Sequence, residues 1–527
     1  MHSEIQRRRT FAIISHPDAG KTTLTEKFLL YGGAVQEAGS VTARKHQRAS
    51  TSDWMEMERK RGISITSTVL QFDYSGYRIN LLDTPGHEDF SEDTYRILTA
   101  VDAVIMVIDA AKGIEAQTKK LFAVCRMRHI PIFTFINKLD RPTKEPFELL
   151  QELEQVLGIH TYPMNWPLGT GLDFKGVYDR RQKEVHLFER TTGGVFKAPV
   201  SIGTLTDPLL TEKLSAEIHH KVQEDIELLE AVGETFDEEK VYTGQLTPVF
   251  FGSAMNNFGV ELLLHGFLQH SLPPISRQMQ GKTIDPEHSA FSGFVFKIQA
   301  NMDPKHRDCI SFVRICSGKF TRNMTVTNMR TEKKIRLASV HTVFGQERES
   351  VDEAYPGDII GIIATGQFGI GDTLTEDTSI IYDAIPAFAP EHIITLQNPD
   401  TANYKRFRDG LSQLLQEGVV QSFELLHPQH HMTVYGAVGP LQFEVVQYRL
   451  QSEYNAASTK EATSWNVVRW TDPSHTKESI IPHLPMGSSL AADTKGRLVI
   501  LFSSEWSLQS FLGKPHGITL SNTPFSN

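Results

Sequence analysis

The sequence is poor in the features that mark membrane, secreted and metal-cluster proteins. Its 527 residues include only three cysteines, and no pair of them has metal-ligand spacing. This excludes a disulfide framework and a cysteine zinc site, and it fits a reducing cytosol. The longest apolar run, residues 100–111, is interrupted by Asp102 and Asp109 and has strand length rather than membrane-spanning length. The first residues also lack the apolar core of a secretory signal, so we expect no membrane contact and a cytoplasmic location.

An excess of positive charge is also missing. Lysine and arginine number 53 against 63 aspartates and glutamates, which gives a net charge of −10. Long-range attraction to nucleic acid is therefore not a property of the whole chain, and we expect no DNA partner. An RNA partner would need local basic patches, for which Arg7–Arg9, Arg44–Arg48 and Arg59–Arg61 are candidates. Taken alone, each patch is more simply interpreted as solvated surface charge.

The first half of the chain alternates short apolar runs with helical patterns. Strands are expected at residues 11–15, 78–82, 103–108, 130–136 and 247–252, and helices at 21–31, 92–100, 117–128 and 257–270. Strands separated by helices predict a parallel, doubly wound sheet, which places ligands at the carboxyl ends of its strands. The stretch from about 159 to 245 interrupts this pattern and is interpreted as an insertion subdomain.

The second half of the chain has a different pattern. Residues 275–290 are polar and aperiodic, as in a linker. Short strands separated by turn residues fill 291–384 and predict a small β-barrel. From 385 to 527 helices return among strands. The sequence thus predicts an α/β P-loop G domain over 1–274 with an insertion, then a β-barrel domain and an α+β domain.

A phosphate-binding loop is predicted where the first strand meets the first helix. Consecutive backbone N–H groups at a helix N-terminus form a concave anion site. In such a loop Lys21 reaches the β- and γ-phosphates, and the Thr22 hydroxyl holds Mg²⁺. Serine stands at position 15, where the usual pattern has its first glycine. The candidate nucleotide-binding residues here are Ser15, His16, Pro17, Asp18, Ala19, Gly20, Lys21, Thr22 and Thr23.

A second motif follows the strand at 78–82. Asp83 takes the place of the carboxylate that holds Mg²⁺ through a water molecule. Gly86 can offer its N–H to a γ-phosphate because no side chain blocks the approach. Asp, Pro and Gly are also common turn residues, so this motif gains weight only after a P-loop. Its nucleotide-binding candidates are Asp83, Thr84, Pro85, Gly86 and His87.

A third motif, Asn137-Lys138-Leu139-Asp140, follows the strand at 130–136 and predicts the base. Guanine presents N1–H and N2–H₂ on one edge, and the Asp140 carboxylate can accept both bonds. Adenine lacks this donor pair, so such a site rejects it and a generic ATPase is disfavoured. Asn137 would brace the loop and Lys138 would cover the base. Ser253 and Ala254 end the last strand and offer a backbone N–H to guanine O6.

The segment 61–66 lies between the first two motifs. A hydroxyl in this place can ligate Mg²⁺ only while the γ-phosphate is present, which makes the segment an order–disorder switch. Ser64, Thr66, Ser67 and Thr68 compete for this role.

Taken together, these motifs resemble the translational GTPases of the elongation factor G type. The resemblance is carried by residues 15–23, 53–66, 83–90 and 137–140. Residues 87–96, 293–307 and 436–443 are similar to the members of that family that act in translation termination. The resemblance covers most of the chain and becomes weaker after about Trp470.

The resemblance implies GTP, GDP and Mg²⁺ as cofactors. It assigns Mg²⁺ to Thr22, Ser64 and, through water, Asp83, with Ser64 in a place where the family usually has threonine. It makes His87 the catalytic residue, which positions the attacking water when rRNA of the large ribosomal subunit moves it into place. The implied function is a monomeric, ribosome-dependent GTPase that dissociates class-I release factors. A ribosome-protection or stress factor of the same family, or a guanine-nucleotide sensor with negligible turnover, are the alternatives.

Overall fold

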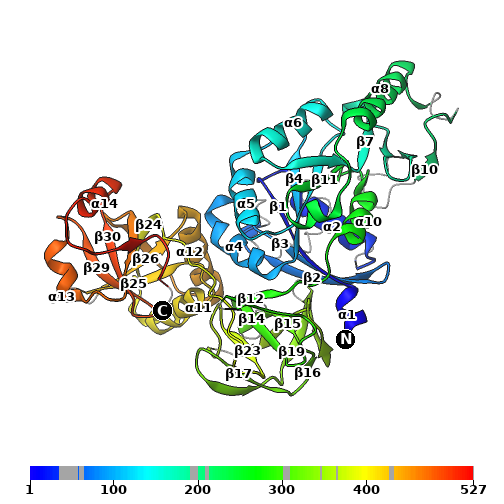
Figure 1. Ribbon diagram of the computed structural model, residues 1–527. Helices are drawn as coiled ribbons and strands as arrows, with labels where there is room; N and C mark the ends of the chain where they lie inside the picture. The colour runs from blue at the N-terminus through cyan, green and yellow to red at the C-terminus, as the bar shows by residue number, and fades with distance from the viewer. Residues whose placement is uncertain are drawn as a thin grey trace.

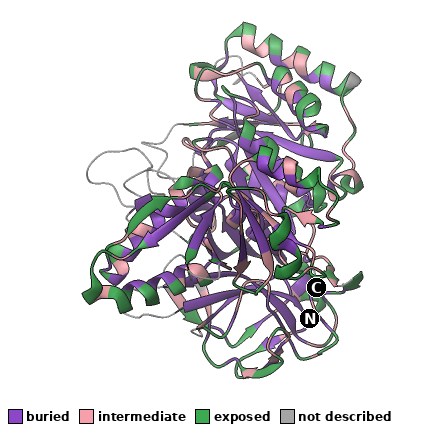
Figure 2. Ribbon diagram, turned by 90° about the vertical axis from the view of Figure 1, so that its left-hand side faces the viewer, coloured by how far each residue is buried: buried purple, intermediate pink, exposed green. Residues whose placement is uncertain are grey.

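The computed structural model describes residues 1–34, 57–58, 64–189, 200–207, 213–279, 281–300, 309–344, 347–363, 366–426 and 432–525. Figure 1 shows three blocks: the α/β G domain, the β-barrel domain against one side of it, and the α+β domain beside both. Strands in all three blocks are largely buried, whereas exposed residues gather on the outward faces of helices and in turns (Figure 2). The predicted fold class is confirmed.

A seven-stranded sheet with the order β2-β3-β1-β4-β5-β11-β6 forms the centre of the G domain. Except for β2, neighbouring strands in it run parallel. Helices cover it on both faces, so its central strands are buried along their whole length and mostly apolar in their middles. The strands are β1 (Arg8–Ser15), β2 (Thr68–Tyr74), β3 (Tyr77–Asp83), β4 (Ala103–Asp109), β5 (Ile132–Asn137), β6 (His160–Pro163) and β11 (Leu246–Phe251).

The helical elements of the G domain are α1 (His2–Gln6), α2 (Lys21–Tyr31), the short 3₁₀ turn η1 (Glu88–Phe90), α4 (Ser91–Ala100), α5 (Ala116–Met127), α6 (Pro146–Leu157), α9 (Glu238–Tyr242) and α10 (Val260–His270). The four predicted G-domain helices, α2, α4, α5 and α10, lie within three residues of their predicted bounds, and α2 coincides with its prediction. The other helical elements of this domain were not predicted.

Two strands of the G-domain sheet differ from the sequence-based expectation. β2 pairs antiparallel with β3 through a tight hairpin, so the sheet is mixed rather than purely parallel. β6, which the sequence places at the start of the insertion, pairs with β11 and forms the sheet edge. A four-residue strand carries too little periodicity to show which sheet it joins.

The insertion packs its own small sheet against one long helix. The sheet has the order β10-β9-β8-β7. Its elements are β7 (Asn165–Leu168), the 3₁₀ turn η2 (Gly171–Asp173), β8 (Gly176–Asp179), β9 (Glu184–Phe188), β10 (Val200–Gly203) and α8 (Ala216–Val232). The Trp166 indole N–H donates to the Asp225 carboxylate at 3.1 Å and ties this sheet to α8.

The β-barrel domain is an antiparallel sheet of the order β18-β17-β23-β14-β15-β22-β19-β20, around an apolar core. The predicted linker is itself partly regular and forms the hairpin β12 (Arg277–Met279) and β13 (Lys282–Ile284). The remaining strands are β14 (Ser292–Ala300), β15 (Cys309–Ser317), β16 (Phe320–Thr321), β17 (Thr325–Asn328), β18 (Lys333–Arg336), β19 (Val340–Phe344), β20 (Glu347–Ser350), β21 (Glu353–Ala354), β22 (Ile359–Ile363) and β23 (Thr373–Thr375).

One antiparallel sheet runs through the whole α+β domain, in the order β27-β24-β26-β25-β29-β30-β28-β31. The segment after Trp470, where the resemblance weakens, therefore completes the same sheet. The strands are β24 (His392–Gln397), β25 (Gln421–Leu425), β26 (Thr433–Ala437), β27 (Thr459–Ala462), β28 (Val467–Thr471), β29 (Ser489–Asp493), β30 (Leu498–Phe502) and β31 (Leu520–Ser521). The helical elements are η4 (Thr401–Asn403), α11 (Tyr404–Gln416), α12 (Pro440–Tyr454), α13 (Lys477–Ile480), η5 (Ile481–His483) and α14 (Glu505–Leu512).

Of the three basic patches, the structure describes Arg7–Arg9. Arg7 is exposed and pairs with Asp73 at 3.3 Å. Arg8 and Arg9 are buried, and the Arg8 guanidinium forms an ion pair of 2.8 Å with Asp358 of the barrel, so they are not solvated surface charge. The patches at Arg44–Arg48 and Arg59–Arg61 lie outside the described residues. Among the helices that the structure describes, none has the length and apolar character needed to cross a membrane.

Candidate nucleotide site

The predicted phosphate loop joins β1 to α2 at the carboxyl edge of the sheet. Gly20 is the N-cap of α2 and has φ 102°, in the left-handed region. A Cβ at this position would collide with the amide nitrogen of Asn137, so glycine is required for both reasons. The first turn of α2 leaves its N–H groups without intrahelical partners, which is the arrangement that binds anions.

The flanking residues of the loop are held individually. The Ser15 hydroxyl donates to the carbonyl of His16 at 2.9 Å, and the His16 ring lies 3.1 Å from the Glu115 carboxylate. Pro17 and Thr23 are half-buried, and Asp18 is exposed.

The Lys21 ammonium donates to the Asp83 carboxylate at 2.6 Å, and both side chains are buried. This contact brings the two predicted phosphate and metal residues together, although 62 residues separate them. A buried lysine needs a carboxylate or phosphate partner because an isolated buried charge is costly. Lys21 and Asp83 therefore mark the charged centre of the site.

The hydroxyls of Thr22 and Ser64 lie 3.3 Å apart. The Thr66 hydroxyl instead donates to Glu58 at 3.1 Å, and that of Ser67 accepts from Lys297 at 2.8 Å. Thr68, the fourth candidate, begins β2 and pairs in register with Asp83 of β3. Ser64 is thus the candidate whose hydroxyl lies within hydrogen-bond distance of Thr22. Two adjacent hydroxyls near a carboxylate form the hard oxygen donor set that Mg²⁺ prefers.

The segment after Asp83 rests against the phosphate loop. The Thr84 hydroxyl donates to the Ile13 carbonyl of β1 at 2.7 Å. Pro85 is buried, and a Cβ on Gly86 would lie 3.7 Å from Cα of Pro17. Gly86 is therefore close enough to the loop for its N–H to face the same ligand.

The Asn137 side chain connects three loops. Its amide donates to the Ala19 carbonyl at 2.9 Å, and its oxygen accepts from the N–H groups of Lys138 and Ala254, both at 2.8 Å. The phosphate loop, the 137–140 motif and the 253–254 loop therefore meet at this one amide. Ser253 and Ala254 are themselves fully buried.

The corner predicted to recognise the base contains the Lys138 ammonium, which is held by other groups, and the half-buried Asp140 carboxylate. The Lys138 ammonium contacts the Asp109 carboxylate at 2.8 Å and the Asp18 carbonyl. Burial would raise the pKa of Asp109, but the bonds from Lys138 and from the Ala111 N–H outweigh it and lower that pKa. Asp140 is half-buried, and within the described ranges no hydrogen bond or ion pair engages its side chain. Its carboxylate is thus available to a ligand.

His87 lies just beyond Gly86, at the start of η1. Its Nδ1 is 3.2 Å from the Asp89 carboxylate and 3.3 Å from the Asp89 backbone nitrogen. The imidazole is about a third exposed, at 37%, so it can be reached from solvent or from a partner.

Sequence reasoning missed three residues of this region. Asp109 ends β4 at the same sheet edge, and its strand-end position was the signal that could have found it. Glu58 accepts from the N–H groups of Ile65 and Thr66 and holds the start of the described switch segment. Asp89 was quoted within the resemblance but given no role.

Comparison with known proteins supports this assignment along the chain. The model of the elongation factor Tu GTP-binding domain matches residues 6–273. The model of elongation factor G domain 2 matches 290–377, and that of the class II release factor RF3 C-terminal domain matches 382–512. A solved structure from Thermus thermophilus shares the fold, with a TM-score of 0.70 at 21% identity over 93% of this chain and 72% of that one.

Curated relatives are similar over nearly the full length. Peptide chain release factor 3 of Gloeobacter violaceus is 55% identical over 98% of this chain and 97% of its own. The protein of the same name from Synechocystis sp. is 54% identical over 97% and 93%. The predicted resemblance is therefore confirmed, and the chain belongs to the peptide chain release factor 3 family, the translational GTPases of termination.

Proposed function

We propose that this GTPase binds Mg²⁺·GTP at the edge built around Asn137 and acts on the ribosome to dissociate class-I release factors. The observation that carries the nucleotide part is the three-way junction at Asn137, next to the carboxylate of Asp140. Guanine offers two N–H donors to such a carboxylate, and adenine does not. The names of the full-length relatives support the termination part. We infer that it works as a monomer in the cytoplasm.

The Mg²⁺ part of the proposal follows from the donor set. Thr22 and Ser64 would hold the ion through their hydroxyls, and Asp83 through water. When bound, the ion neutralises charge on the β- and γ-phosphates. Lys21, whose ammonium contacts Asp83, would contact the same phosphates.

His87 is proposed as the catalytic residue that orients the attacking water. Phosphoryl transfer depends mainly on positioning and charge stabilisation, so control of one imidazole is enough to gate the reaction. We expect low GTP turnover in the free protein and strong stimulation by ribosomes.

The decisive experiment measures release of a class-I factor from terminated ribosomes with GTP, with GDP and without nucleotide. We expect GTP-dependent release, and a His87→Ala variant that binds GTP normally but has lost about 100-fold or more of its stimulated hydrolysis. His220→Ala, an exposed histidine on α8, is the matched control and should behave as wild type. Release that is indifferent to nucleotide, or full turnover by His87→Ala, would contradict the proposal.

A further inference from the structure

The segment that follows Gly86 forms hydrogen bonds with the α+β domain at three of its residues. The Asp89 carboxylate accepts from the Leu441 N–H at 2.7 Å. Glu92 accepts from the Gln421 amide at 3.4 Å. The Arg96 guanidinium donates to the backbone carbonyls of residues 417 and 418, at 3.4 and 3.2 Å. The α+β domain therefore holds η1 and α4, the elements next to His87.

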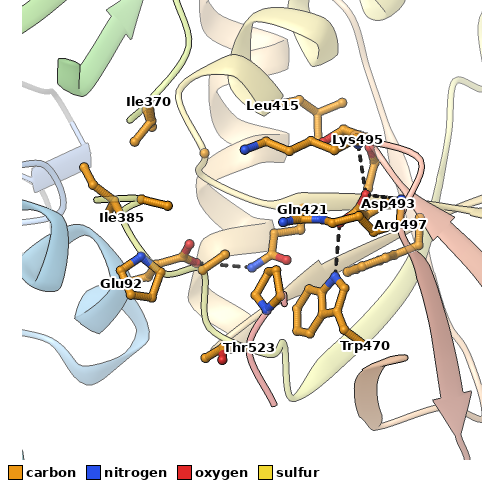
Figure 3. A pocket seen from close by; sticks show the side chains of 18 of the residues that line it. Glu92, Ile370, Ile385, Leu415, Gln421, Trp470, Asp493, Lys495, Arg497 and Thr523 are labelled. Carbon is orange, nitrogen blue, oxygen red and sulfur yellow. Dashed lines mark hydrogen bonds and ion pairs between the residues drawn. The ribbon is translucent and has the colours of Figure 1, made fainter. Parts of the chain in front are cut away.

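Besides these polar contacts, the two domains share a small apolar cluster that includes Phe90 and Val445. A cavity of about 380 Å³ lies beside α4, lined by residues of the G domain, of residues 384–387 and of the α+β domain. Figure 3 shows Gln421 reaching across its edge to Glu92, while Trp470 and Arg497 turn to Asp493 within the α+β domain. Beside the cavity, the polar coupling between the two domains thus depends on individual side chains such as Gln421 and Glu92.

Asp89 is the contact closest to the proposed chemistry. One carboxylate oxygen lies 3.2 Å from Nδ1 of His87, and the other accepts from Leu441 in the first turn of α12. Gly439, the N-cap of that helix, leaves room for the group, because a Cβ there would collide with the Asp89 carboxyl carbon. The carboxylate is largely buried, with 9% of the side chain exposed. It is therefore shared between an imidazole and a helix N-terminus.

We propose that Asp89 is a positioning residue for His87 in GTP hydrolysis, and that the N-terminus of α12 in the α+β domain holds Asp89 in place. This inference rests on the proposed role of His87. It adds that the α+β domain takes part in hydrolysis through Asp89, without touching nucleotide itself.

The chemistry of the imidazole explains why a carboxylate is needed. If Nδ1–H donates to Asp89, then Nε2 carries a lone pair that can accept a hydrogen bond from the attacking water. The Asp89 backbone N–H, 3.3 Å from Nδ1, favours the opposite tautomer, with the proton on Nε2. Because a hydrogen bond to a charged carboxylate is stronger than one from a neutral amide, we expect Asp89 to keep the proton on Nδ1. The Leu441 N–H in the first turn of α12 fixes the other oxygen of that carboxylate in place.

The test compares Asp89→Asn with Asp89→Ala in single-turnover GTP hydrolysis on ribosomes. Asparagine can still accept from Leu441, but its amide would then donate to Nδ1 and enforce the wrong tautomer. We expect the stimulated rate to fall about 100-fold for Asn and only about 10-fold for Ala. GTP affinity and the ribosome concentration for half-maximal rate should stay unchanged. Glu88→Gln, its exposed neighbour, should leave all three quantities unchanged.

If Asp89 only capped α12, the stimulated rate would fall more for Asp89→Ala than for Asp89→Asn, because asparagine preserves a cap and alanine does not. Asn milder than Ala would therefore overturn the positioning role. Asp89→Glu, which keeps the charge, should recover more of the rate than Ala. If His87→Ala loses its stimulated rate while both Asp89 variants keep theirs, this inference fails and the proposed function stands. If His87→Ala keeps its rate, the proposed function fails first.

Gly439→Ala tests the contribution of α12. Its added methyl group should displace Asp89 and lower the stimulated rate by about 5- to 10-fold, without changing GTP affinity. Combined with Asp89→Ala it should cause no further loss, because both changes remove the same contact. Fully additive losses, or a Gly439→Ala variant of wild-type rate, would overturn the involvement of α12.

Discussion

The G domain contacts its two neighbours in different ways. Against the barrel it presents the amino-terminal side of its sheet, in a buried polar network. The Arg314 guanidinium pairs with Asp102 at 2.5 Å, and Arg277 pairs with the other oxygen of the same carboxylate at 2.7 Å. Thr10 of β1 and Asn80 of β3 both donate to the Gly357 carbonyl. These contacts avoid the nucleotide edge.

The α+β domain instead contacts the elements that follow Gly86. Its partners are η1 and α4, through Asp89, Glu92 and Arg96, and a small apolar cluster that includes Phe90 and Val445. One barrel residue also reaches this side, because Lys297 donates to Ser67 just beyond Ser64.

The interface with the barrel is therefore expected to be a permanent joint, and the interface with the α+β domain a joint that responds to the bound nucleotide. A buried, multiply paired arginine cannot leave its carboxylate without a large cost, so the barrel should move with the G domain. Contacts made by segments that rearrange with the γ-phosphate can be made and broken with it. We therefore expect nucleotide to change the docking of the α+β domain and leave the barrel in place.

The largest expected effect comes from breaking the barrel joint. Asp102→Ala leaves Arg314 and Arg277 without their shared partner in a buried place, so the free energy of unfolding should fall by about 3–5 kcal/mol. Urea unfolding measures this loss. Asp352→Ala, which removes the exposed partner of Arg322 in the barrel, is the control and should cost less than about 1 kcal/mol. Equal costs for the two variants would show that the joint is not permanent.

Much of the candidate site could be predicted from the sequence because its parts lie at strand ends. The helix after the phosphate loop, the carboxylate at Asp83 and the 137–140 motif each follow an apolar run, and parallel strands bring such ends to one edge. The confirmed fold class rests on the same alternation of periods. Local patterns were sufficient wherever a candidate residue lies close to the end of its own strand or helix.

The parts of the fold and of the candidate site that were not predicted depend on contacts between residues far apart in the sequence, which no local pattern indicates. Asp89 meets Leu441 across 352 positions, and Lys297 meets Ser67 across 230. Both partners look ordinary in their own segments: a carboxylate in a helix-start turn, and a lysine in a strand. The place of β6 in the main sheet was missed for a related reason, since pairing with β11 is decided by distant packing rather than by its four residues.

Weakening the responsive joint should have an intermediate effect. Arg96→Ala removes bonds to the carbonyls of residues 417 and 418, and should cost about 2 kcal/mol of docking free energy. Hydrogen exchange should then rise in α12 and β25 but not in the barrel, and should differ less between GDP and a GTP analogue. Arg126→Ala, a surface residue on α5, is the matched control. Faster exchange in β14 and β15 would show that the joints are not independent.

The smallest effect separates docking from the internal stability of the α+β domain. Val445 and Val446 are adjacent on α12 and both buried, but Val445 packs with Phe90 and Ile65 of the G domain, whereas Val446 packs in its own domain's core. Each valine-to-alanine change should cost about 1–2 kcal/mol. Val445→Ala should lower the difference in α12 exchange between nucleotide states and leave unfolding of the domain nearly unchanged. Val446→Ala should do the reverse. Because the two variants lose the same methyl groups from neighbouring positions, identical behaviour would mean that α12 does not distinguish its two faces, and nucleotide could not act through it on the α+β domain.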